Sequence, residues 1–260
     1  MRRQSGVLSL FSILGGVGLL LLALFASGAA ATTSMNIEYG PAGQTRTAWS
    51  DQDMVGIQLS NGTWEFTGGR TFIMDGGGGT LDVDWDFTTN ADPFVDGVFS
   101  FTNNTGSTQD LVLTYSVSVV PSLPVATGGA SVIGSMTVDS GGGTLGHVLS
   151  GGGTPDPMYT TLVDGSVFET LLNFDSTLTV PFGSAATPSE SFGLPGLTKP
   201  VPGGVSTSIG SRLSFSVTPG DSVAFTSRFE VVPEPSTALL LGFGLLALKA
   251  SGRRSNADTH

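Results

Sequence analysis

The chain has 260 residues, no cysteine and a formal net charge of −11. Between its hydrophobic ends lie about 200 residues, enough for one sizeable domain with its own core. Residues 32–232 hold 19 Asp and Glu against five Lys and Arg, a net charge of −14. This charge repels phosphate backbones and excludes nucleic acid as a partner. The missing cysteine excludes disulfides, thiol catalysis and thiolate metal sites.

The N-terminus has the form of a secretory signal peptide. Arg2 and Arg3 precede an apolar stretch, residues 7–25, and Ala29-Ala30-Ala31 offers a cleavage site. We therefore expect residues 1–31 to form a signal helix that directs export and is then removed. The apolar stretch is longer than most, so an uncleaved N-terminal anchor is the alternative.

The next 200 residues, 32–231, have an all-β composition, rich in Gly, Thr, Ser, Val and Phe. Three short β-type runs, at residues 54–60, 63–67 and 70–74, are separated by Asn61-Gly62 and Gly68-Gly69. Because Asn-Gly between such runs is a strong hairpin signal, we expect turns at both dipeptides.

The stretch of residues 80–88 alternates strictly between apolar and acidic side chains. Its apolar positions are Leu81, Val83, Trp85 and Phe87. Its acidic positions are Asp82, Asp84 and Asp86. In a strand, this alternation makes one face apolar and places the three carboxylates about 7 Å apart on the other. Because calcium prefers carboxylate oxygens, these three aspartates are a candidate calcium site. The alternative is a solvated strand face that charge protects from aggregation.

Further along, alternation predicts strands at residues 98–101 and 111–120. In the middle of the chain we expect strands at residues 131–139, 167–172 and 177–182, although residues 158–173 could instead hold a short helix.

Two features are expected before the C-terminal tail. Residues 188–204, rich in proline and glycine, predict a long surface loop. Residues 212–217 and 223–231 alternate on either side of Pro219-Gly220, which predicts a closing hairpin.

The C-terminus combines three features. Pro233-Glu234-Pro235 ends the preceding structure, because each proline lacks an amide hydrogen and restricts the residue before it. The apolar run after it predicts a short hydrophobic helix over residues 237–250, closed by Arg253 and Arg254. Twelve apolar helical residues rise only about 18 Å against a hydrocarbon core of about 30 Å, so the helix is a poor permanent anchor.

This order of features, over residues 232–254, resembles the PEP-CTERM sorting signal. The resemblance implies that Pro233, Glu234 and Pro235 are recognised by an exosortase, a membrane enzyme that processes the tails of exported proteins. It also implies that Arg253 and Arg254 form a cytoplasmic stop, that residues 255–260 are a cytoplasmic tail, and that the protein accompanies exopolysaccharide and biofilm. The same tail is also labelled after ice-binding proteins that carry it, a label that says nothing about ice here.

Catalytic chemistry is sparse between the two hydrophobic ends. The single histidine there is His147, and no Gly-x-Ser-x-Gly motif accompanies it, so we expect neither a serine hydrolase nor a usual zinc site. Paired carboxylates of a glycosidase remain open, because acids are plentiful. Trp49, beside Ser50-Asp51-Gln52-Asp53, is the candidate exposed ring for binding a sugar.

We therefore expect one antiparallel β-sandwich over residues 32–231, of jelly-roll or immunoglobulin-like type, with a signal helix before it and a short hydrophobic helix after it. The leading function is that of a non-enzymatic exported protein, sorted through its tail by way of the inner membrane to the cell surface or extracellular matrix. No cofactor is expected beyond the calcium considered above. The alternatives are a glycan-binding module, with or without calcium, and a polysaccharide-acting hydrolase that uses carboxylates.

Overall fold

The computed structural model describes residues 32–52, 54–74, 78–90, 93–139, 141–149, 154–173 and 177–234. These residues form seventeen β-strands and no helix. The described part of the chain therefore contains no helix that is long and apolar enough to cross a membrane. The predicted signal helix, residues 1–31, and the predicted C-terminal helix, residues 237–250, lie outside the described residues.

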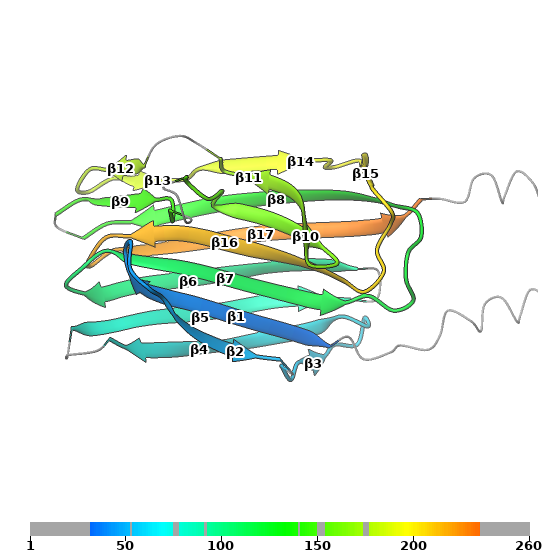
Figure 1. Cartoon of the computed structure of the whole chain (residues 1–260), viewed down its shortest axis with the longest axis horizontal. Helices are drawn as coiled ribbons and strands as arrows, with labels where there is room; N and C mark the ends of the chain where they lie inside the picture. Colours follow the sequence, from blue (N-terminus) through cyan, green and yellow to red (C-terminus); the bar gives the residue numbers. More distant parts are fainter. Residues whose placement is uncertain are drawn as a thin grey trace, which may run out of the picture.

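The strands form two antiparallel sheets, one in front of the other in Figure 1. Sheet A has the order β11 (Ser166–Leu171), β10 (Tyr159–Val163), β16 (Ser208–Val217), β7 (Gln109–Ser118), β1 (Thr33–Pro41), β2 (Thr47–Asp51). Two short strands extend sheet A beside β16: β9 (Gly143–Gly146) and β12 (Leu178–Val180).

Sheet B has the order β8 (Ala126–Thr137), β17 (Ser222–Pro233), β6 (Phe94–Thr105), β5 (Gly79–Thr89), β4 (Trp64–Ile73), β3 (Ile57–Gln58). Three short strands pair with the outer edge of β8: β13 (Ala185–Ala186), β14 (Ser189–Phe192) and β15 (Lys199–Val201). All pairings in both sheets are antiparallel. The all-β prediction and the expectation of two packed antiparallel sheets are confirmed; the jelly-roll or immunoglobulin-like subtype stays a prediction.

The core lies between the sheets and is rich in aromatic rings. Period-two alternation turns one face of each long strand inward, where apolar side chains lose their contact with water. Phe99 of sheet B packs on Tyr115 of sheet A with ring centroids 4.7 Å apart, and Phe101 meets Phe215 edge-on at 4.8 Å. Interdigitated rings from both inner faces are what hold such a double layer together.

A hydrogen bond between two side chains crosses the middle of this core. The hydroxyl of Tyr115, fully buried on β7, shares a 2.9 Å hydrogen bond with Ser227 Oγ on β17. Nearby, Tyr159 and Ser211 of sheet A share another at 2.8 Å. Burial raises the pKa of both tyrosines, so both phenols stay neutral and their hydroxyls serve only as hydrogen-bonding groups.

The predicted turn at Gly68-Gly69 is wrong, because β4 runs without a break from Trp64 to Ile73. Gly68 pairs directly with Trp85 of β5. A Cβ atom at Gly68 would lie 2.8 Å from the indole ring of Trp85. The glycine therefore marks a close approach of a ring to the backbone and not a turn.

Two expectations for the middle of the chain are also corrected. Residues 158–173 form the β10–β11 hairpin and not a helix. Its two-residue loop is Asp164-Gly165, with φ of 51° and 75°, as a type I′ turn requires. Residues 188–204 are not one long loop, because β14 and β15 lie within them and pair with β8.

The predicted closing hairpin is wrong in its pairing. Both of its strands form, as β16 and β17, but β16 belongs to sheet A and β17 to sheet B. The β6–β7 connection crosses between the sheets in the same way. Asn103 at the end of β6 and Asp221 before β17 join the two crossings: Asn103 N donates to Asp221 O at 3.0 Å.

Candidate functional site

The three predicted calcium ligands lie on the outer face of β5, as expected from the alternation. Asp82 is engaged by its neighbours: Thr71 Oγ1 donates to it at 2.7 Å and Asn104 Nδ2 at 2.8 Å. Asp84 and Asp86 are exposed. Among the described residues, no group of three or more acidic or histidine side chains is placed to hold a metal ion. Calcium binding by the three aspartates stays a prediction.

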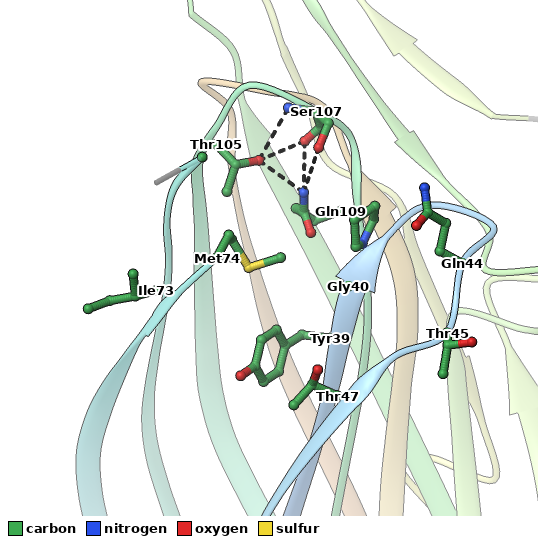
Figure 2. Close-up of a pocket in the computed structure, with 12 residues that line it drawn as sticks. Tyr39, Gly40, Gln44, Thr45, Thr47, Ile73, Met74, Thr105, Ser107 and Gln109 are labelled. Carbon is green, nitrogen blue, oxygen red and sulfur yellow. Dashed lines mark hydrogen bonds between the residues drawn. The ribbon is translucent and has the colours of Figure 1, made fainter. Parts of the chain in front are cut away.

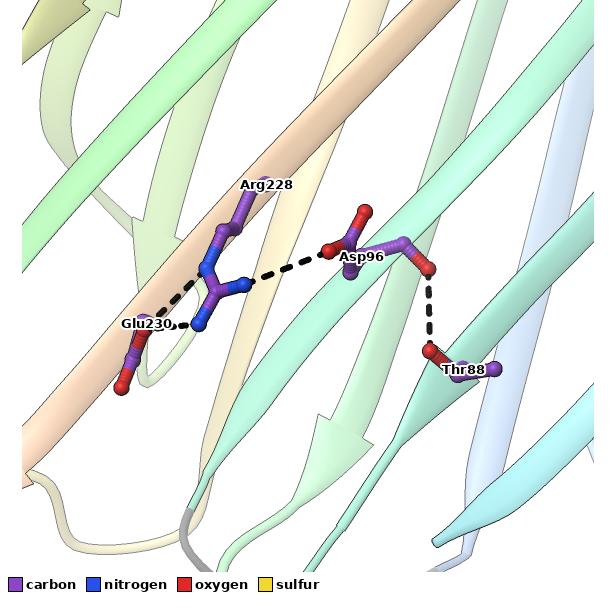
Figure 3. Close-up of polar contacts among 4 residues, drawn as sticks. All are labelled: Thr88, Asp96, Arg228 and Glu230. Carbon is purple, nitrogen blue, oxygen red and sulfur yellow. Dashed lines mark hydrogen bonds and ion pairs between the residues drawn. The ribbon is translucent and has the colours of Figure 1, made fainter.

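The same face of sheet B carries one arginine. Arg228 on β17 pairs with Glu230 on its own strand, Nη2 to Oε2 at 2.5 Å, and with Asp96 on β6 at 3.4 Å (Figure 3). Hydrogen bonding to Glu230 raises the pKa of Arg228. Within the described part of the chain, no ion pair reaches Asp82, Asp84 or Asp86.

Trp49, the candidate sugar-binding ring, lies on β2 and is half-buried. Its ring stacks on Trp85 at 6.0 Å between centroids and meets Phe72 at 6.5 Å. The Arg70 guanidinium lies 5.0 Å from the ring centroid of Trp49. Much of the ring is thus used in packing, and a role in binding stays a prediction.

His147 follows β9, with Nδ1 2.6 Å from the carbonyl oxygen of Asp156. This contact holds the histidine in the connection between β9 and β10.

The start of the C-terminal tail is part of sheet B. The last two residues of β17 pair with β8, Val232 with Thr127 and Pro233 with Ala126. Glu234 N then donates to Val125 O at 3.2 Å. A proline is tolerated at this position because β17 pairs with β6 only as far as Glu230, so Pro233 has a paired strand on one side alone, as in an edge strand.

Both ends of the described chain leave the sandwich at the same end, on the right of Figure 1. β17 extends two residues beyond the expected domain boundary at residue 231. Of the predicted recognition residues, Pro233 and Glu234 are therefore attached to the sheet. Pro235, Arg253 and Arg254 lie outside the described residues.

Residues 231–254 match the family model of the PEP-CTERM protein-sorting motif. The chain carries a PEP-CTERM motif. The match begins one residue before the stretch expected from the sequence and ends at the same residue. The PEP-CTERM motif implies export to the cell envelope or surface and sorting by an exosortase. No curated protein and no solved structure matches the chain.

A pocket that the sequence did not predict lies at the other end of the sandwich, shown in Figure 2. It lies where the β1–β2, β4–β5 and β6–β7 connections meet, and its volume is about 420 Å³. Its residues come from positions up to about 70 apart in the sequence, for example Tyr39 and Gln109. No local pattern joins such residues, so the sequence alone gave no signal for them.

Proposed function

We propose that this chain is a non-enzymatic exported protein that an exosortase sorts through the PEP-CTERM motif, by way of the inner membrane, to the cell surface or extracellular matrix, where it accompanies exopolysaccharide. The observation that carries the proposal is the match over residues 231–254, directly continuous with the last strand of the domain. A folded domain joined without a linker to a sorting signal is cargo for that signal.

The placement of the titratable groups supports a non-enzymatic role. Asp110 and Asp164 are the described carboxyl groups with clearly shifted pKa values, and both bind backbone of neighbouring turns. Burial raises the pKa of Asp110, which accepts a hydrogen bond from Gly43 N at 3.1 Å. Asp164 accepts hydrogen bonds from residues 206–208. Each carboxylate therefore has a structural task, whereas a general acid or base would face a cleft.

The sorting proposal predicts that replacing Pro233 and Pro235 together by alanine stops processing. The double variant should keep an unprocessed C-terminus and stay with the membrane fraction, because the recognition element is lost. Cell fractionation and the intact mass of the protein in each fraction measure both effects.

Pro181→Ala is the matched control, since Pro181 is an exposed proline directly after β12, which pairs with β9 at the end of the sandwich opposite to the end of β17 (Figure 1). It should be processed and located as the unchanged protein is. If the double variant reached the same location with the same mature C-terminus, the proposed sorting route would be wrong.

A further inference from the structure

The pocket in Figure 2 is built from neutral polar groups around one aromatic ring. Its described lining residues are Tyr39, Gly40, Pro41, Gln44, Thr45, Thr47, Ile73, Met74, Gly78, Thr105, Ser107 and Gln109. None of these carries a charged side chain. In a domain with a net charge of −14, a recess of about 420 Å³ whose described lining is uncharged is a distinct chemical environment. Its size falls in the range of small-molecule sites, about 300–1,000 Å³.

Hydrogen bonds between the surrounding connections fix the rim of the pocket. Ala42 N of the β1–β2 connection donates to Thr108 O of the β6–β7 connection at 3.0 Å. Gly106 N donates in turn to Gly78 O, before β5, at 3.3 Å. Described residues of the three connections are thus hydrogen-bonded to one another, which holds this part of the rim in place without a ligand.

Gln109 supplies the polar group at the base of the pocket. Its side chain is 1% exposed, and its Nε2 donates to Thr105 Oγ1 at 3.0 Å, to Ser107 O at 3.2 Å and to Ser107 Oγ at 2.9 Å. Because a carbonyl oxygen can only accept, the contact with Ser107 O fixes which end of the amide is nitrogen. Figure 2 shows the amide oxygen on the opposite side from these bonds.

That oxygen, Gln109 Oε1, is buried and has no hydrogen-bond partner among the described residues. An unpaired buried acceptor is costly because it has lost its hydrogen bonds to water, so a donor in the pocket would be stabilised there. A purely apolar ligand would leave this cost in place. An anion would meet both the unpaired oxygen and the negative domain.

Tyr39 supplies the apolar surface. One side of its ring packs on Phe72 with centroids 4.1 Å apart, and the ring also borders the pocket. A tyrosine ring beside hydroxyl and amide groups suits a ligand with an apolar face of C–H groups and a rim of hydroxyls. A pyranose ring has both.

We propose that this pocket binds one neutral hexose, either as a free sugar or as the terminal residue of a glycan. A sugar hydroxyl donates to Gln109 Oε1, Thr45 and Thr47 bond other hydroxyls, and the sugar ring lies against Tyr39. The pocket lies at the end of the sandwich opposite to the end of β17 (Figure 1). The inference deepens the proposed link with exopolysaccharide but rests on the pocket alone.

To test this, the purified full chain is titrated with glucose, galactose and mannose, and binding is measured by saturation-transfer NMR. Neutral oligosaccharides of the same sugars distinguish a chain end from a free sugar, and glucuronic acid probes the effect of charge. We expect at least one neutral hexose to bind and glucuronic acid to bind at least about tenfold more weakly. Thr47→Ala should weaken binding about three- to tenfold, the effect of one hydrogen bond, and Tyr39→Ala should abolish it.

Thr67→Ala is the matched control, because Thr67 is an exposed threonine on the outer face of β4, away from the pocket. It should bind as the unchanged protein does, and melting temperatures verify that each variant is folded. The proposal would be overturned if no neutral sugar showed saturation transfer at about 10 mM. At that concentration even a ligand with a Kd of about 1 mM occupies most of the protein. Binding that survives both Tyr39→Ala and Thr47→Ala would also overturn it and move attention to Trp49. Either failure leaves the sorting result untouched, since that experiment measures location and mass.

Discussion

Asp164 closes the β10–β11 hairpin and at the same time binds the connection before β16. Its carboxylate accepts hydrogen bonds from the backbone N–H groups of Ser206, Thr207 and Ser208, at 2.7–3.1 Å, and from the Thr207 hydroxyl at 2.9 Å. Desolvation alone would raise the pKa of Asp164, but these hydrogen bonds outweigh it and lower the pKa from 3.8 to about 2.

This shift predicts a pH-dependent contribution to stability. A carboxyl group with a lowered folded-state pKa stabilises the fold above its unfolded value of 3.8, and the contribution is lost as the pH falls through about 2. Asp164→Ala should therefore lower the free energy of unfolding at neutral pH by about 1 kcal/mol, since solvent screens this exposed group. The difference from the unchanged protein should shrink as the pH is lowered from 3.8 towards 2.

Thermal unfolding at several pH values measures this difference. Asp164→Asn is the control, because asparagine also tolerates a positive φ and keeps one acceptor. It should lose less stability than the alanine variant. A loss that stays constant with pH would contradict the role given to the ionised carboxylate.

At the scale of the strand, Gly68 lets β4 pass under the indole of Trp85. Gly68→Ala should lower the free energy of unfolding by about 1–3 kcal/mol, because the new Cβ atom would lie 2.8 Å from ring atoms and force them to move. Gly106→Ala is the matched control, since no atom lies within 4 Å of a Cβ atom at that position. Urea unfolding followed by tryptophan fluorescence compares the two. Equal urea midpoints for the two variants would show that the indole ring of Trp85 does not restrict the side chain at position 68.

The strands themselves were largely predictable, and their pairing was not. Alternation along residues 80–88 identified β5 with its inner and outer faces, because a strand repeats every two residues. The short Pro219-Gly220 connection predicted a hairpin, yet it carries the chain from sheet A to sheet B. A short turn is compatible both with a hairpin and with a crossing to the other sheet. Which of the two forms depends on a distant partner, Asn103, whose amide Nδ2 donates to Val217 O at 2.9 Å. Such contacts across more than a hundred residues leave no local pattern.

For the molecule as a whole, the acidic surface predicts that salt stabilises the domain. With a net charge of −14 over residues 32–232, repulsion between carboxylates opposes folding, and ions screen it. The melting temperature should rise with sodium chloride. If the aspartates of β5 bind calcium, about 1 mM calcium chloride should raise it further than sodium chloride of equal ionic strength, and Asp84→Asn should remove that excess.

The effect of calcium decides whether the three aspartates of β5 form a calcium site or a solvated, charged strand face. An equal effect of calcium and sodium at matched ionic strength would leave Asp82, Asp84 and Asp86 as a solvated, charged face. A melting temperature that falls with salt would contradict the repulsion argument itself.

The tail was the most predictable part of the candidate site, and the pocket the least. The order of proline motif, apolar run and arginines is written in consecutive residues, so the sequence alone located it to within one residue of the matched range. The pocket depends on three connections meeting at one end of the folded sandwich. Strand pairing within sheet A brings Tyr39, Thr47 and Gln109 together, and Ile73 and Thr105 come from sheet B.

The edges of sheet B determine where one molecule can add a strand to another at high protein concentration. The outer edge of β8 is covered by three strands of two to four residues, β13, β14 and β15, and β3 at the opposite edge has two residues. Pro200 within β15 has no N–H to offer, and Lys199 beside it carries a charge. At the β8 edge, a neighbouring molecule therefore finds no long row of free backbone groups on which to extend sheet B. At the opposite edge, β3 pairs only with Trp64 and Glu65, and among the described residues no strand pairs with the rest of the outer side of β4. Strand addition between crowded copies is therefore blocked at β8 and directed to β4.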